Sequence, residues 1–214
     1  MRKFTLVLLS VVLALPACAT NISRKMENST ILIKMKIHDV AENKDKWGVC
    51  SGVYIKKDIV LSAAHCVDFE DGMDLKEIWV KKGEKSERAV IVRVDPAADL
   101  LLLYTPLEGT PVKFAKKVRR GEECWVIGNP LGLLDILTKG IVSKINYKFK
   151  GEKAGFIIVD AVCLPGNSGG AVVDESGHLI GILTRSTSML GGLGASGLGF
   201  AVDLKTIREF LKGI

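Results

Sequence analysis

Pro165-Gly166-Asn167-Ser168-Gly169-Gly170 is the stretch of this 214-residue chain that says most about its fold and chemistry. It places one serine between glycines, which let the backbone turn sharply and let a carbonyl group approach closely. The backbone N–H groups of Gly166 and Ser168 can then point at one oxygen atom, as an oxyanion hole requires. The stretch therefore predicts a nucleophilic Ser168, which needs a histidine base and a carboxylate from elsewhere in the chain.

His65 is the candidate base among the three histidines of the chain. It follows the apolar run from Val60 to Ala64, which predicts a buried strand with the imidazole at its end. His38 lies in an alternating strand pattern and His178 follows a polar turn, so we interpret both as surface residues.

Asp99 is the candidate acid, because it directly precedes the apolar strand Leu100-Leu101-Leu102-Leu103-Tyr104. A charge at the start of such a strand is costly unless it is paired, and an imidazole is a suitable partner. Asp95, the nearest rival, stands before Pro96 and is typical of the start of a turn. The other rivals cluster in a polar loop and are interpreted as solvated: Asp68, Asp71 and Asp74.

The chain order His65, Asp99, Ser168 is that of the chymotrypsin-like double β-barrel. From about Thr30 to its end the chain resembles the trypsin/chymotrypsin-like serine proteases, and among them the HtrA/Do-like bacterial branch. The segments that carry the resemblance are Ser62–Cys66, Asp95–Leu100, Ile127–Gly132, Gly140–Ser143, Asp160–Ala161, Pro165–Gly170 and Gly197–Val202.

The resemblance implies a serine endopeptidase that acts on polypeptides through an acyl-enzyme and uses no cofactor or metal. Two features depart from the family. Trypsin has an aspartate where this chain has Asn167, so we expect no trypsin-like zymogen activation. HtrA-like proteins usually carry a PDZ domain after the protease domain, and we expect none in a chain that ends at Ile214. The alternative is a catalytically silent protease-fold binding or chaperone-like protein, which should lack a triad member.

The same resemblance locates the pocket for the substrate residue that precedes the scissile bond. The position at which trypsin selects basic residues lies near Val162, which is neutral. We therefore expect a preference for small or medium aliphatic residues. The candidate substrate-binding residues are Val162, Cys163, Leu164, Thr184, Arg185 and Ser186.

The resemblance also implies a disulfide between Cys50 and Cys66, beside the candidate base. Of the five cysteines, Cys124 and Cys163 have no clear family counterpart, so they either pair with each other or remain buried thiols. No cysteine or histidine spacing indicates a zinc site.

The N-terminus predicts export. Residues 1–17 read as a signal peptide, because a basic start precedes an apolar core that is too short for a transmembrane helix. Leu15-Pro16-Ala17-Cys18 resembles a bacterial lipoprotein signal, with Cys18 lipidated; ordinary cleavage after Ala19 is the alternative. We expect a protein anchored by lipid on the periplasmic side of the cell envelope, or otherwise periplasmic or secreted, with residues 18–29 as a polar tether.

Composition and patterning predict an all-β fold. The 48% hydrophobic content is sufficient for a packed core, and the net charge of +6 comes without interleaved aromatic and basic residues, which excludes a nucleic-acid partner. Membrane contact is expected only through the lipid anchor. We expect a protease domain over 30–214, made of two six-stranded antiparallel barrels (about 30–105 and about 121–202) and a C-terminal helix (about 204–212) that Asp203 caps.

Overall fold

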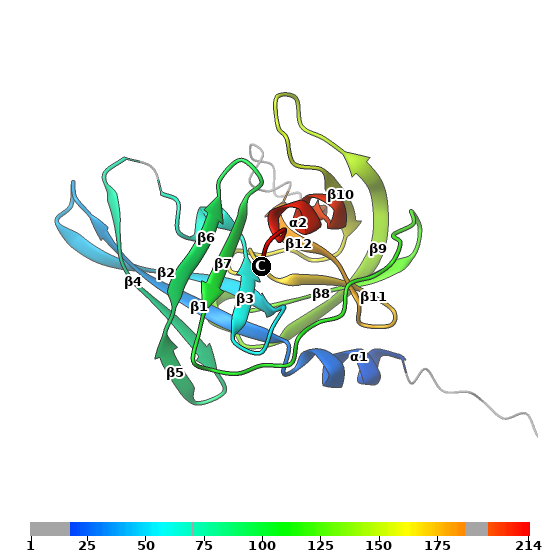
Figure 1. The fold of residues 1–214 in the computed structure, drawn as a ribbon, viewed down its shortest axis with the longest axis horizontal. Helices are drawn as coiled ribbons and strands as arrows, with labels where there is room; N and C mark the ends of the chain where they lie inside the picture. Colours follow the sequence, from blue (N-terminus) through cyan, green and yellow to red (C-terminus); the bar gives the residue numbers. More distant parts are fainter. Residues whose placement is uncertain (1–17, 70, 187–196) are drawn as a thin grey trace, which may run out of the picture.

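The computed structural model describes residues 18–69, 71–186 and 197–214, and its main regular elements are β-strands (Figure 1). They form two all-β units that lie side by side, as expected. The first unit contains β1 (Thr30–Asp39), β2 (Lys44–Tyr54), β3 (Ile59–Ser62), β4 (Met73–Lys82), β5 (Lys85–Arg88), β6 (Val90–Asp95) and β7 (Leu100–Tyr104). The second contains β8 (Glu123–Gly128), β9 (Ile136–Tyr147), β10 (Phe156–Asp160), β11 (Ala171–Asp174), β12 (Leu179–Ser186) and β13 (Gly199–Asp203).

The second unit is a closed antiparallel barrel of six strands in the order β10-β13-β12-β11-β8-β9. The first differs in detail from the six-stranded barrel expected, because it is a seven-stranded sheet in the order β5-β4-β1-β2-β3-β7-β6. Its extra strand β5 is polar and exposed throughout, so neither apolar alternation nor burial marked it in the sequence. The N–H of Ala89, directly after β5, donates to the carbonyl of Ile78 on β4 at 3.0 Å and extends the β4–β5 pairing by one hydrogen bond.

Strand β7 shows why its sequence is a continuous apolar run. Leu100 and Leu102 belong to the larger core, which is centred on the second barrel, whereas Leu101 and Leu103 belong to the core of the first sheet. Successive side chains of a strand point to opposite faces, so a strand between two cores is apolar on both. This packing sets Asp99, at the start of β7, against the boundary between the two units.

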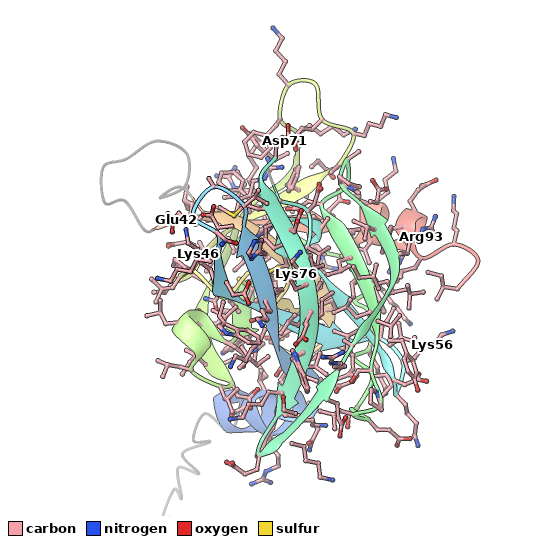
Figure 2. The ribbon with its side chains drawn as sticks, turned by 90° about the vertical axis from the view of Figure 1, so that its left-hand side faces the viewer. Glu42, Lys46, Lys56, Asp71, Lys76 and Arg93 are labelled. Carbon is pink, nitrogen blue, oxygen red and sulfur yellow. A yellow bond between two sulfur atoms is a disulfide. The ribbon has the colours of Figure 1, made fainter. Side chains whose placement is uncertain are left out.

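The C-terminal helix α2 spans Leu204–Phe210 and begins at Asp203, whose carboxylate accepts the backbone N–H of Thr206 at 2.8 Å. Leu204, Ile207 and Phe210 form its buried face. Figure 2 shows Arg93, on β6, beside this helix, where its guanidinium donates to the carbonyl of Phe210 at 2.7 Å. A residue of the first sheet thus satisfies a carbonyl at the end of the helix that follows the second barrel.

Residues 18–29 differ from the polar tether that the sequence predicted. Helix α1 (Cys18–Met26) lies below the second barrel in Figure 1, and its side chains Ile22 and Met26 are buried in the larger core. The two are four residues apart, so they share one helical face. The segment was misread because the residues around this pair are polar.

The predicted signal peptide, residues 1–17, lies outside the described residues. Among the residues that are described, no helix has the length and apolar character needed to cross a membrane.

Candidate active site

His65 and Asp99 are in direct contact at the junction of the two units. His65 lies in a single 3-10 turn, Ala64–Cys66, that follows β3. Its Nδ1 is 3.0 Å from both carboxylate oxygens of Asp99, and its backbone N–H donates to Oδ1 of the same carboxylate at 3.0 Å. An ionised carboxylate only accepts hydrogen bonds, so Nδ1 is the donor to it, and in this tautomer of the imidazole the lone pair is on Nε2.

The carboxylate of Asp99 is nearly buried and directly follows a closed turn. Its side chain is only 9% exposed, against 37% for the imidazole. Its φ of +52° is in the left-handed region, which aspartate tolerates better than most residues. The turn before it is closed by the N–H of Ala98, which donates to the Asp95 side chain at 3.1 Å. A strained residue in a closed turn, aimed at a histidine, is typical of a functional site.

Ser168 lies four residues after Leu164, in the turn that precedes β11. Its hydroxyl donates to the carbonyl of Thr184 at 3.5 Å, and within the described part of the chain it has no hydrogen bond to His65. Thr184 and Arg185 line both the hollow that contains His65 and the hollow that contains Ser168, so the two hollows adjoin. The structure thus brings the three candidate triad residues to one cleft, with the Ser168 hydroxyl turned toward β12.

The loop before Ser168 leaves two backbone donors free. The carbonyl of Pro165 accepts from the N–H of Leu131 at 2.9 Å, and the carbonyl of Asn167 accepts from Gly170 at 2.8 Å. The C=O and N–H of a trans peptide point in opposite directions, so the N–H groups of Gly166 and Ser168 face away from these partners. In the described residues neither N–H has an acceptor, as an oxyanion hole requires.

Gly166 is required at this place in the loop. Its φ is +96°, and a Cβ on it would lie 2.7 Å from the carbonyl oxygen of Asn129 and 2.9 Å from the nitrogen of Leu131. Both neighbours are backbone atoms that no side-chain rotation can move. Any other residue would therefore push the loop out of this conformation.

The hollow beside Ser168 is small, with a volume of about 40 Å³. It contains five of the six candidate substrate-binding residues: Cys163, Leu164, Thr184, Arg185 and Ser186. Val162 does not line it, because its side chain is 49% exposed on the neighbouring surface. Strand β13 limits the space, since a Cβ on Gly199 would lie 2.4 Å from the sulfur of Cys163.

The hollow on the His65 side is larger, about 430 Å³, and Arg185 forms part of its wall. The Arg185 guanidinium is paired with Glu152 at 2.8 Å and lies over the rings of Phe149 and Phe156. Asp68, interpreted from the sequence as solvated, is exposed and also lines this hollow. The sequence predicted Arg185 as a substrate-binding residue. It did not predict the contacts of Arg185 with Glu152 and the two rings, because these residues belong to another hairpin, β9–β10.

Four of the five cysteines, all but Cys18, divide into a disulfide pair and two thiols. Cys50 and Cys66 form a disulfide, which joins β2 to the turn that carries His65. Their separation of 16 residues corresponds to roughly 3 kcal/mol of loop entropy removed from the unfolded state. Cys124 and Cys163 are both buried and form no disulfide, and burial raises the pKa of each thiol to about 12.

Two polar residues at the cleft were not singled out in the sequence. Ser51 and Asn129 are both fully buried, and both make hydrogen bonds around the loop that carries Ser168. A serine next to a cysteine in a buried strand does not by itself indicate a functional residue, so Ser51 was missed. Asn129 lies inside the segment Ile127–Gly132 that carries the family resemblance, but no role was predicted for it from the sequence. In the described residues no group of three acidic, histidine or cysteine side chains could hold a metal ion.

Comparison with known proteins places the chain in a family. Residues 50–182 match the model of the trypsin-like peptidase domain. A probable periplasmic serine protease do/HhoA-like from Haemophilus influenzae is 37% identical over 183 residues, which cover 78% of this chain and 36% of that protein. The serine endoprotease DegS of the same organism is 32% identical over 171 residues, 77% of this chain and 49% of DegS.

Solved structures agree on the fold. The HtrA-type protease AlgW, solved with a tripeptide, has a TM-score of 0.73 and 28% identity over 89% of this chain and 61% of that chain. The Rv3671c protease from M. tuberculosis has a TM-score of 0.74 over 98% of this chain and 91% of that chain, at 22% identity, and so supports the fold alone.

The architecture is the all-β chymotrypsin-like one, as the sequence predicted. The chain belongs to the trypsin-like peptidase family, and the relatives named above are of the HtrA/Do type. It spans between about a third and a half of the length of these curated relatives, at 36% and 49%.

Proposed function

We propose that this protein is an exported serine endopeptidase that hydrolyses peptide bonds through the triad Ser168, His65 and Asp99. The observation that carries the proposal is the contact of His65 with both oxygens of a nearly buried Asp99 carboxylate, at 3.0 Å, in the same cleft as Ser168. The two free N–H donors beside Ser168 support it. A binding protein on this scaffold would not need this arrangement.

Acylation begins when the Ser168 hydroxyl turns from the carbonyl of Thr184 toward Nε2 of His65. This is a side-chain rotation, and catalytic hydrogen bonds are often long or absent before substrate binds. The Ser168 oxygen attacks the peptide carbonyl carbon while Nε2 takes the proton. The negative charge that develops on the carbonyl oxygen is stabilised by the N–H groups of Gly166 and Ser168.

Collapse of this intermediate breaks the C–N bond, and His65 returns its proton to the leaving amine. A water molecule then gives a proton to Nε2 and attacks the acyl carbon. The bond from this carbon to the Ser168 oxygen breaks, Nε2 returns the proton to that oxygen, and the acid is released. Asp99 remains ionised in both halves of the cycle. It keeps the proton on Nδ1 and stabilises the imidazolium that forms twice.

The small hollow beside Ser168 favours a small or medium aliphatic residue before the scissile bond. Among the described residues, its lining offers Cys163, Leu183 and Thr184 and no carboxylate that would bind a basic side chain. Sequencing the cleavage sites in an unfolded protein substrate tests this specificity. A majority of sites after arginine, lysine or glutamate would contradict it.

A fluorophosphonate probe tests the proposed nucleophile. We expect stoichiometric labelling of the folded protein, with the modification mapped by peptide sequencing to Ser168 alone. The same protein unfolded in denaturant serves as the control and should not react, because an isolated serine hydroxyl is a weak nucleophile. Labelling at another serine, or none at all in a protein that is folded by circular dichroism, would contradict the proposal.

Export by residues 1–17 and a lipid on Cys18 are part of the same proposal. The Cys50–Cys66 disulfide supports export, because such bonds persist mainly outside the cytoplasm. Replacing Cys18 by alanine should move the protein from the detergent-extracted membrane fraction to the soluble fraction, whereas the neighbouring Ala19→Ser should not. A Cys18→Ala protein that stays with the membrane would contradict the anchor and leave the peptidase proposal intact.

A further inference from the structure

Ser51 connects the first sheet to the loop that carries Ser168. It lies near the end of β2, directly after Cys50 of the disulfide, and is fully buried. Its backbone N–H donates to the carbonyl of Ser168 at 2.7 Å. A residue of the first unit is therefore hydrogen-bonded to the backbone of the candidate nucleophile in the second unit.

The hydroxyl of Ser51 has a single possible arrangement of its hydrogen. Its oxygen accepts from the backbone N–H of Asn129 at 2.7 Å and from the Asn129 side-chain amide at 3.2 Å. A hydroxyl accepts two hydrogen bonds and donates one, so its own proton is left for the carbonyl of Gly166, at 2.7 Å. All three bonds of this buried group are thus in use.

Two hydrogen bonds, one of them from the Ser51 hydroxyl, fix the two peptide groups that flank Gly166. The peptide before it is held by the N–H of Leu131 on the carbonyl of Pro165, and the peptide after it by the Ser51 hydroxyl on the carbonyl of Gly166. With both neighbouring peptides fixed, the direction of the Gly166 N–H is also fixed. Glycine here needs such restraint, because it has the widest choice of backbone conformations.

Asn129 holds the hydroxyl in place. Its side-chain amide also donates to the carbonyl of Ile31 on β1 at 3.0 Å, and its side-chain oxygen accepts from the N–H of Asp135 at 3.1 Å. The asparagine is fully buried and each of its polar atoms has a partner. The restraint on Gly166 therefore extends to the first strand of the fold.

The side chain of Asn167 does not supply this restraint through its oxygen. That oxygen is buried and has no hydrogen-bond partner among the described residues. Asn167 is neutral, so it also forms no ion pair that would anchor the loop. The neutral contact from Ser51 is the side-chain hydrogen bond that reaches the carbonyl of Gly166.

We propose that Ser51 is a positioning residue, whose hydroxyl keeps the Gly166 N–H directed at the oxyanion. The inference rests on the proposed peptidase function. It assigns to Ser51 an effect on the transition state, since the Gly166 N–H bonds most strongly to an oxygen that carries charge. Binding of the uncharged substrate depends much less on the same donor.

Ser51→Ala tests the proposal. We expect kcat to fall by about 10- to 100-fold with KM changed less than about twofold, a smaller loss than the 10²–10³ for removing a donor outright, because the N–H remains but is no longer fixed. The affinity for a peptide boronate, which forms a tetrahedral adduct on Ser168, should fall in parallel with kcat/KM.

Ser62→Ala is the matched control. The Ser62 hydroxyl is equally buried and donates at 2.7 Å to the backbone carbonyl of Ser51, so its loss removes one buried hydrogen bond from the same place without touching Gly166. We expect Ser62→Ala, which removes one hydrogen bond, to lower the melting temperature less than Ser51→Ala, which removes three, and to keep kcat within about twofold of wild type.

Equal kcat in Ser51→Ala and Ser62→Ala would overturn the inference, and so would a loss confined to KM. If Ser51→Ala does not fold, Ser51→Cys replaces it, because a thiol has a similar volume but is a weaker hydrogen-bond donor. We expect its kcat to fall while KM is maintained. An unchanged kcat would again overturn the inference. Its Cys50–Cys66 pairing is checked by peptide mapping. Wild-type protein that cleaves no peptide and takes no fluorophosphonate label would refute the proposed function instead, so the two failures are distinguishable.

Discussion

Replacing Ser168 by alanine is expected to lower kcat for peptide hydrolysis by about 10⁶-fold, the loss measured when a triad serine is removed from a serine protease. The variant keeps the free backbone N–H groups of Gly166 and of position 168, and it keeps the cleft. KM should therefore change little. What it loses is the covalent step. Among the described residues that line the hollow beside His65, the hydroxyl belongs to Thr184, which donates it to the carbonyl of Phe200 at 3.4 Å. Initial rates on a fluorogenic peptide, with enzyme concentration set by active-site titration of the wild type, provide the measurement.

Ser176→Ala is the matched control for this loss, since Ser176 lies in an exposed turn before His178 and outside the cleft. Its rate should equal that of the wild type within experimental error. A Ser168→Ala enzyme that retains more than about a tenth of the wild-type rate would mean that another group is the nucleophile.

The strands that sequence patterns predicted best are those whose side chains enter a core. The run Leu100–Tyr104 coincides with β7, because both of its faces are buried and its apolar residues are therefore continuous. The polar strand β5 and the helix α1 were missed for the opposite reason. Their sequences carry little apolar periodicity, and pairing or docking against distant segments determines their structure.

The candidate site divides in the same way. The motifs that contain His65, Asp99 and Ser168 are local features, so the sequence alone was enough to predict them as a triad, which stays a proposal. The roles of Ser51, Asn129 and Glu152 depend on contacts across 115, 78 and 33 positions of the chain, which no local pattern contains. Val162 shows that a family resemblance does not fix which side chains line a pocket. The resemblance predicted Val162 as a substrate-binding residue, but Val162 does not line the hollow beside Ser168.

Asp99→Asn is expected to lower kcat by about 10⁴-fold and to leave KM nearly unchanged. The amide has the size and shape of the carboxylate, so the fold should be retained. One of its two groups is now an NH₂ donor. If the amide oxygen keeps the backbone N–H of His65, which lies 3.0 Å from Oδ1, the NH₂ group faces Nδ1.

An NH₂ group that faces Nδ1 favours the tautomer in which Nδ1 is unprotonated. The proton then lies on Nε2, which can no longer accept the proton of Ser168. The rate of fluorophosphonate labelling should fall along with kcat, because the same proton transfer activates the nucleophile in both reactions.

Asp95→Asn separates this effect from a general loss of negative charge near His65. Asp95 lies in the same turn, and its carboxylate accepts the N–H of Ala98 at 3.1 Å, a bond that an amide oxygen can also accept. This variant should keep kcat within about threefold of wild type. If Asp99→Asn were no slower than Asp95→Asn, the carboxylate of Asp99 would not orient the base, and the triad proposed here would be wrong in its third member.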